Sequence, residues 1–186
     1  MPLPLPHGGV LINRYIEPKE IPALTQKAKP LFPLSLTPRE VSDLELIADG
    51  VLSPLTGFMG STDYQSVITR MRLANGLAWT LPVTLSVTEK EAAALKEGQE
   101  IALMDNDPEN PLAILKINEI FRFDKEAEAK AVYGTADGKH PGVAYTETLG
   151  DFYLAGKIDL LRRPQHATFP SYRKTPKEIR ELFASR

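Results

Sequence analysis

A helix-start motif, Thr-Pro-x-Glu, occurs twice in the chain, at residues 37–40 and 175–178. In such a capping box the threonine hydroxyl accepts a hydrogen bond from the N–H of the glutamate, whose carboxylate accepts one from the N–H of the threonine. Proline fits the first helical position, because its missing N–H would have no partner there. The two boxes therefore fix two helix starts, one near each end of the chain.

Apolar residues follow each box at helical spacing. After the first box they stop before Gly50, a typical residue just beyond a helix, and they comprise Val41, Leu44, Ile47 and Ala48. After the second box they comprise Ile179, Leu182 and Phe183. We predict a helix from each box, and we expect the second one either to fray, to fold back on its own domain or to be buried by a neighbouring copy.

Strand-like patterns dominate the middle of the chain. Residues 81–88 alternate between apolar and other side chains, which indicates a half-buried strand. Apolar runs at 9–16, 100–105, 112–123 and 151–161 predict further strands.

Three shorter helices are expected between these strands. One begins at Thr62, where Gln65 would complete a capping box and Met71 would face inward. The others cover 88–95 and 124–134, and 17–33 looks irregular with one short helix. Helices that precede a strand-rich region favour an α+β fold around a mostly antiparallel, barrel-like sheet.

Composition excludes several functional classes. The net charge of −2 disfavours a general nucleic-acid binder, and the lack of cysteine excludes disulfides and thiolate metal sites. The start, MPLPLPHGG, lacks the basic and apolar regions of a secretory signal, and no apolar run approaches the roughly 20 residues of a membrane helix. We expect a cytoplasmic protein without a nucleic-acid or membrane partner.

The side chains form no self-contained catalytic pattern. The three histidines, His7, His140 and His166, are widely spaced and predict no metal site. A basic connector could meet an anion, although a solvated linker is the simpler interpretation; it contains Arg162, Arg163, His166, Arg173 and Lys174.

The remaining candidates have simple structural interpretations. The carboxylate pairs Asp43 with Glu45 and Asp105 with Asp107 are expected to be solvated. Residues 139–143 could line a cleft but more simply form a turn before a strand, and Trp79 is expected to anchor a core or an interface.

Five stretches, in order over nearly the whole chain, carry a family resemblance. They are LTPREVSDLELIADGVLSPLTGFMG (36–60), MRLANGLAWTLPVTLSV (71–87), HPGV (140–143), GDFYLAGKIDLL (150–161) and FPSYRKTPKEIRELF (169–183). Together they resemble the N-terminal region of the ATP sulfurylase (sulfate adenylyltransferase) family. The resemblance implies a PUA-like β-barrel with flanking helices, followed by a linker and a catalytic α/β domain. It also implies formation of adenosine 5′-phosphosulfate and pyrophosphate from sulfate and Mg-ATP.

The family's catalytic motifs do not occur in these 186 residues. None of the glutamines, Gln26, Gln65, Gln99 and Gln165, begins a Gln-x-Arg-Asn stretch, and there is no His-x-x-His. We therefore assign no catalytic, cofactor-binding or metal-binding residue to this chain, and we expect it to be inactive alone.

The resemblance also predicts the organisation of the chain. Residues 1–165 would form the PUA-like domain, and 166–186 would form the linker and the first helix of a catalytic domain that is missing here. The implied partners are that catalytic domain and further copies in a homo-oligomer of the full-length enzyme, with Mg-ATP and sulfate bound elsewhere than in this chain. The alternatives are a stand-alone PUA-like RNA-binding module and a non-catalytic interaction domain.

Overall fold

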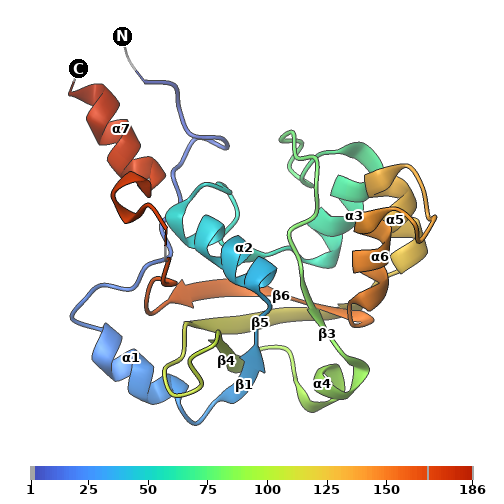
Figure 1. Cartoon of the computed structure of the whole chain (residues 1–186), viewed down its shortest axis with the longest axis horizontal. Helices are drawn as coiled ribbons and strands as arrows, with labels where there is room; N and C mark the ends of the chain where they lie inside the picture. Colours follow the sequence, from blue (N-terminus) through green and yellow to red (C-terminus); the bar gives the residue numbers. More distant parts are fainter. Residues whose placement is uncertain (1–2, 167, 186) are drawn as a thin grey trace. The chain divides into compact units, whose positions relative to one another are not determined.

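A computed structural model describes residues 3–166 and 168–185, and these form two compact units (Figure 1). The first unit comprises residues 1–57, 100–116 and 157–186, and the second comprises 58–99 and 117–156. Each unit is therefore built from segments that are separated in the sequence.

The strands of the described chain form a mixed sheet. Its strands are β1 (Phe32–Ser35), β2 (Gly57–Phe58), β3 (Leu85–Val87), β4 (Glu100–Met104), β5 (Ala113–Arg122) and β6 (Phe152–Leu160). The strand order is β1-β4-β5-β6-β2, and β3 also pairs with β6. β1 runs parallel to β4, whereas β4 with β5 and β3 with β6 are antiparallel.

The expected α+β class is confirmed, but the expected closed barrel is wrong. β1 and β2 lie at opposite ends of the strand order, and no described pairing joins them. β1 was not foreseen, because Pro33 interrupts its short apolar run. Proline is tolerated there because β1 is an edge strand, where one row of N–H groups needs no strand partner.

The first unit contains helices α1 (Ile21–Ala28), α2 (Pro38–Asp49) and α7 (Pro176–Ala184). The capping box of α2 is confirmed: Thr37 Oγ1 accepts from Glu40 N at 3.3 Å and Glu40 Oε2 accepts from Thr37 N at 2.8 Å. Its expected apolar face is buried at Leu44, Ile47 and Ala48. Gly50 ends it with φ 81°, at a point where a side-chain Cβ would lie 2.2 Å from Ile12 O.

The α7 helix begins at the second capping box, as predicted from the sequence. Thr175 N donates to Glu178 Oε2 at 2.7 Å, and Glu178 N donates to Thr175 Oγ1 at 3.2 Å. The helix lies beside the N-terminal arm (Figure 1), where Arg180 donates to Pro4 O at 2.6 Å. Its apolar stripe nevertheless stays open, with Leu182 39% and Phe183 57% exposed.

The second unit contains helices α3 (Ser61–Arg70), α4 (Glu89–Ala94), α5 (Lys125–Tyr133) and α6 (Pro141–Thr148). An aromatic cluster of Tyr64, Phe123 and Tyr153 lies at its centre, and the rings of Phe123 and Tyr153 stack at 3.7 Å. The buried carboxylate of Glu128 accepts from the hydroxyls of Tyr64 at 2.8 Å and Tyr153 at 2.9 Å. This polar cluster joins α3, α5 and β6.

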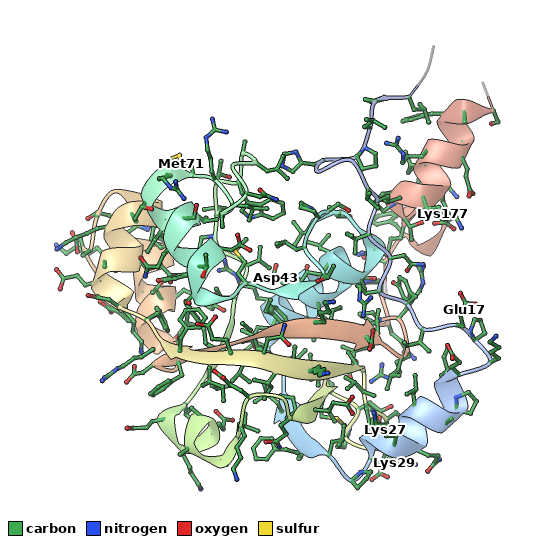
Figure 2. The ribbon with its side chains drawn as sticks, turned by 180° about the vertical axis from the view of Figure 1, so that it is seen from behind. Glu17, Lys27, Lys29, Asp43, Met71 and Lys177 are labelled. Atoms are coloured by element: carbon green, nitrogen blue, oxygen red, sulfur yellow. The ribbon has the colours of Figure 1, made fainter. Side chains whose placement is uncertain are left out.

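The start and end of α3 differ from the prediction. Its N-cap is Gly60, and Ser61 N donates to Glu119 Oε2 of β5 at 2.8 Å, so the box expected at Thr62 is wrong. Met71 ends the helix with φ 54° and is 61% exposed rather than inward (Figure 2). A carboxylate distant in sequence thus replaces the local cap.

Two expected strands are shorter than predicted. Residues 9–16 contain a single bridge, Tyr15 to Leu160, and no regular strand. Of residues 81–88 only β3 is a strand, and Leu81 is 54% exposed. Alternation alone is insufficient there, because backbone pairing with β6 begins only at Leu85.

Candidate functional site

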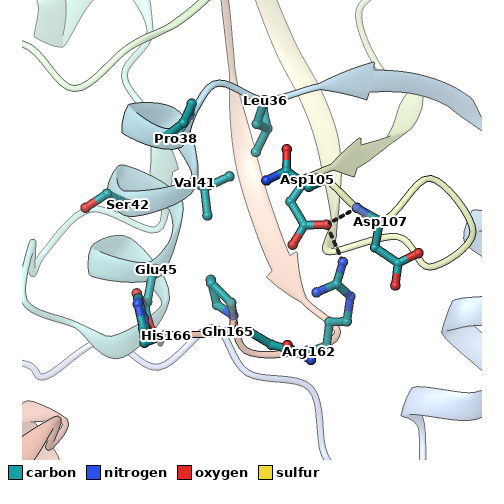
Figure 3. A pocket seen from close by; sticks show the side chains of 12 residues that line it. Leu36, Pro38, Val41, Ser42, Glu45, Asp105, Asp107, Arg162, Gln165 and His166 are labelled. Atoms are coloured by element: carbon teal, nitrogen blue, oxygen red, sulfur yellow. Dashed lines mark hydrogen bonds and ion pairs between the residues drawn. The ribbon is translucent and has the colours of Figure 1, made fainter. Parts of the chain in front are cut away.

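A cavity of about 510 Å³ lies in the first unit, between α2, the loop after β4 and the connector after β6 (Figure 3). Its apolar wall is formed by Leu36, Pro38, Val41 and Pro164. Its polar residues are Ser42, Glu45, Asp105, Asn106, Asp107, Arg162, Gln165 and His166. The volume is within the range of small-molecule sites.

Arg162 fixes the connector to the loop after β4. Its Nη2 lies 2.5 Å from Asp105 Oδ1 and donates to Asn110 O at 3.0 Å. Burial alone would raise the pKa of Asp105, but the hydrogen bonds from Arg162 and from the N–H of Asp107 outweigh it and hold the pKa below its ordinary value. Asp105 is therefore a charged partner of Arg162 at neutral pH.

His166 pairs with the middle of α2. Its Nε2 lies 2.8 and 2.9 Å from the two carboxylate oxygens of Glu45 (Figure 3). Because a carboxylate only accepts hydrogen bonds, this geometry assigns a proton to Nε2.

Arg163 pairs with the end of α2. Its Nη2 lies 3.8 Å from Asp49 Oδ1, and its guanidinium lies over the ring of Tyr15 at 4.5 Å from the centroid. Burial raises the pKa of Asp49 above its ordinary value despite the nearby cation. The connector thus contacts α2 at two carboxylates that are one helical turn apart.

These pairs decide what the cavity can bind. Arg162 and His166 already have carboxylate partners, and Asp107 adds a further negative charge to the lining. The cavity is therefore not arranged to receive a sulfate or a phosphate. Outside it, Arg173 Nε donates to Thr168 O at 3.1 Å.

The partners of this connector were not predicted from the sequence. Glu45 and Asp105 were expected to be solvated, and Asp49 was not a candidate. A usable signal exists, because Glu45 and Asp49 are four residues apart and share one face of α2. Arg163 and His166, which can pair with carboxylates, lie three residues apart in the connector.

The other candidate residues do not converge. His7 lies in the N-terminal arm, His166 pairs with Glu45, and His140 belongs to the second unit. Among residues 3–166 and 168–185, no group of three histidine, aspartate or glutamate side chains could hold a metal ion. Asp43 lies on α2 near Arg39, and burial raises its pKa.

The motif at residues 139–143 has a structural role that differs from the one expected. Residues 139–143 begin α6 rather than a strand, because His140 Nδ1 accepts from Gly142 N at 3.2 Å and caps the helix. Trp79 is half-buried, and its Nε1 donates to Leu81 O at 2.8 Å.

Comparison with known proteins identifies the class of domain. Residues 4–163 match the family of PUA-like domains, and the chain belongs to that family. The chain is homologous to the N-terminal region of sulfate adenylyltransferases. It is 51% identical over 181 residues to the sulfate adenylyltransferase of Synechococcus sp. (strain JA-3-3Ab) and 48% identical over 182 residues to that of Symbiobacterium thermophilum.

The chain spans only part of these relatives. Each alignment covers 97% of this chain and 46% of the relative. A solved structure described as a hexameric APS kinase from Thiobacillus denitrificans is similar with a TM-score of 0.75 and 29% identity, covering 98% of this chain and 32% of that one. In the described part of the chain, no helix has the length and apolar character needed to cross a membrane.

Proposed function

We propose that this chain acts as the non-catalytic N-terminal region of an ATP sulfurylase. The observation that carries the proposal is the 51% identity with a sulfate adenylyltransferase across 97% of the chain. In the proposed reaction a sulfate oxygen attacks the α-phosphorus of Mg-ATP, the bond to the bridging oxygen breaks, and pyrophosphate leaves. Such a reaction depends on positioning two anions and stabilising the charge on the phosphorus.

The described site supports a role outside the chemical step. The cavity of the first unit carries the carboxylates Glu45, Asp105 and Asp107. Its basic side chains, Arg162 and His166, already pair with two of these carboxylates. Two polyanionic substrates would be repelled there. We therefore place the binding of Mg-ATP and sulfate on residues that follow the region matched here.

The open stripe of α7 supports a structural role. Leu182 is 39% and Phe183 57% exposed, on a helix that is capped by Thr175. Apolar side chains that are exposed together on one face of a helix indicate that this face packs against another surface. In this proposal residues 1–165 form the PUA-like domain, and 166–186 lead into a catalytic domain that covers the stripe.

The test compares this chain alone with the same chain joined to the remaining region of the Synechococcus relative. Pyrophosphate release from ATP is measured with sulfate and, as a surrogate, molybdate. We expect turnover by the joined protein and none by the 186-residue chain. Turnover by the chain alone would refute the non-catalytic role, and an inactive but folded joined protein would refute the assignment to ATP sulfurylase.

The proposal includes a homo-oligomeric, cytoplasmic enzyme. The oligomer is supported by the similarity to a structure described as hexameric, and the location is supported by the lack of cysteine. Sedimentation equilibrium of the joined protein tests the first point. A salt-dependent, tight retention of structured RNA on filters would instead favour an RNA-binding module, although the net charge of −2 opposes it.

A further inference from the structure

The connector that links β6 to α7 carries two arginines and a histidine within five positions, and each has a carboxylate partner on another element. Arg162 pairs with Asp105 at 2.5 Å, Arg163 with Asp49 at 3.8 Å, and His166 with Glu45 at 2.8 Å. The partners come from two places, the loop after β4 and one face of α2. The connector is therefore attached on two sides along its length.

Arg163 extends this network to the start of α7. Its charge acts on Asp49 and also on Glu178, the glutamate of the α7 capping box. The pKa of Glu178 is lowered by the hydrogen bonds from Thr175 first and, to a smaller extent, by Lys174 and Arg163. The guanidinium thus contacts the end of α2 and the ring of Tyr15, and only its charge reaches the first turn of α7.

The α7 helix has few other attachments. None of its described residues is buried, and Arg180 donates a hydrogen bond from the helix to Pro4 O of the N-terminal arm. Its apolar stripe holds it only in part, because Ile179 is half-buried whereas Leu182 and Phe183 are exposed. Packing of the helix is therefore limited, and the connector is the covalent link through which the first unit can direct α7.

We propose that Arg162, Arg163 and His166 form an electrostatic clamp that holds the connector on α2 and on the loop after β4, and so sets the direction in which α7 leaves the sheet. Ion pairs that are partly exposed contribute little one by one, so the clamp opens at modest cost. Opening would let α7 reorient while the sheet and the core stay folded. This role does not depend on the proposed enzymatic activity.

The lack of cysteine allows a direct test by spin labelling. Lys29, just after α1, and Lys177, on α7, are exposed residues of the first unit and are replaced by cysteine for nitroxide labels (Figure 2). Pulsed electron–electron double resonance then gives the distribution of the distance between the two nitroxide labels, one beside α1 and one on α7. In the parent we expect one narrow distribution.

The clamp variants are Asp105→Asn, Glu45→Gln and Asp49→Asn, singly and combined. Each keeps the size of the side chain and removes one charge. We expect the population outside the parent distance to rise about two- to five-fold for each single change, and further in the triple variant. Asp43→Asn is the matched control, because it removes the same charge from α2 without a partner in the connector.

Salt provides a second measurement that needs no clamp variant. At about 1 M NaCl the screening length falls to about 3 Å. The distance distribution of the parent should therefore broaden toward that of the triple variant, whereas the distribution of the triple variant should change little. Circular dichroism confirms that each protein is folded. The clamp proposal would be refuted if the distance distribution of the parent stayed narrow in about 1 M salt and those of the single clamp variants equalled that of Asp43→Asn.

Discussion

At the scale of single residues, Gly150 lies where the backbone leaves no space for a side chain. A Cβ there would lie 2.0 Å from Val87 O and 2.7 Å from Thr88 N, both backbone atoms at the end of β3. Overpacking against atoms that cannot rotate away costs roughly 1–3 kcal/mol, and this contact lies at the severe end. β3 and the turn before β6 must therefore separate if any other residue occurs at 150.

We predict that Gly150→Ala lowers the melting temperature by several degrees, since about 1 kcal/mol corresponds to roughly 2–4 °C in a chain of this size. Gly138→Ala is the control, because its Cβ would approach only the Glu147 carboxylate at 3.5 Å. Differential scanning calorimetry measures both. Equal melting temperatures for the two variants would contradict the predicted clash.

The two tyrosines that donate hydrogen bonds to Glu128 make the stability of the fold depend on pH in the alkaline range. Burial raises the pKa of Tyr64 and Tyr153 above the ordinary value, and the nearby Glu128 adds to the rise. In the unfolded chain the same hydroxyls ionise near pH 10. Their contribution to folding is therefore fully present below about pH 10 and is lost as the pH rises through the higher pKa values of the folded state.

We predict a loss of up to about 1.4 kcal/mol per pH unit for each tyrosine above pH 10, measured as the free energy of unfolding in urea. Tyr64→Phe and Tyr153→Phe should each be less stable at pH 7 by roughly 1–3 kcal/mol, because Glu128 loses a donor. Each should also show a shallower decline above pH 10. Tyr172→Phe, with a ring that is 83% exposed, is the control.

At the scale of elements, the chain offers a true and a false capping threonine for comparison. Thr37 caps α2, whose apolar face is buried. Thr62 instead lies inside α3, where the first N–H, that of Ser61, donates to Glu119. We predict that Thr37→Ala costs about 1 kcal/mol and that Thr62→Ala is nearly neutral. Thermal melts decide this, and an equal loss in both variants would mean that Thr62 does cap α3.

The local signals in the sequence were sufficient for most helices and for the long strands. The boxes at Thr37 and Thr175 both form as predicted, because a capping box needs only residues three positions apart. β4, β5 and β6 were likewise predicted from their apolar runs.

Features that depend on distant residues could not be predicted in the same way. β1 exists because it pairs with β4, about 70 positions later, and the openness of the sheet depends on which edges meet. The pair of His166 with Glu45 spans 121 positions, so neither residue indicates the other locally. The cavity could not be predicted from the sequence for this reason, because its residues come from segments that lie far apart in the chain.

At the scale of the whole molecule, the proposed burial of α7 predicts that one substitution has two different effects. In the 186-residue chain Phe183→Asp should change the melting temperature little, since Phe183 is 57% exposed. In the joined enzyme it should lower the melting temperature, because a charge would be buried without a partner.

Lys177→Asp, on an exposed part of the same helix, is the control in both proteins. Scanning fluorimetry gives the four melting temperatures. If Phe183→Asp is equally mild in both proteins, α7 is not covered by the added region.

The interleaving of the two units has a consequence for the order in which a nascent chain can fold. Segments 58–99 and 117–156 are inserted between parts of the first unit, so all of the second unit has been synthesised once residue 156 is reached. Tyr15 still lacks its bridging partner Leu160 at that moment. Domains arranged one after another usually fold from the N-terminus onward during translation. Here residues near Tyr15 are synthesised long before their partners near Leu160, and a chain stalled near residue 156 would expose an incomplete first unit to chaperones and proteases.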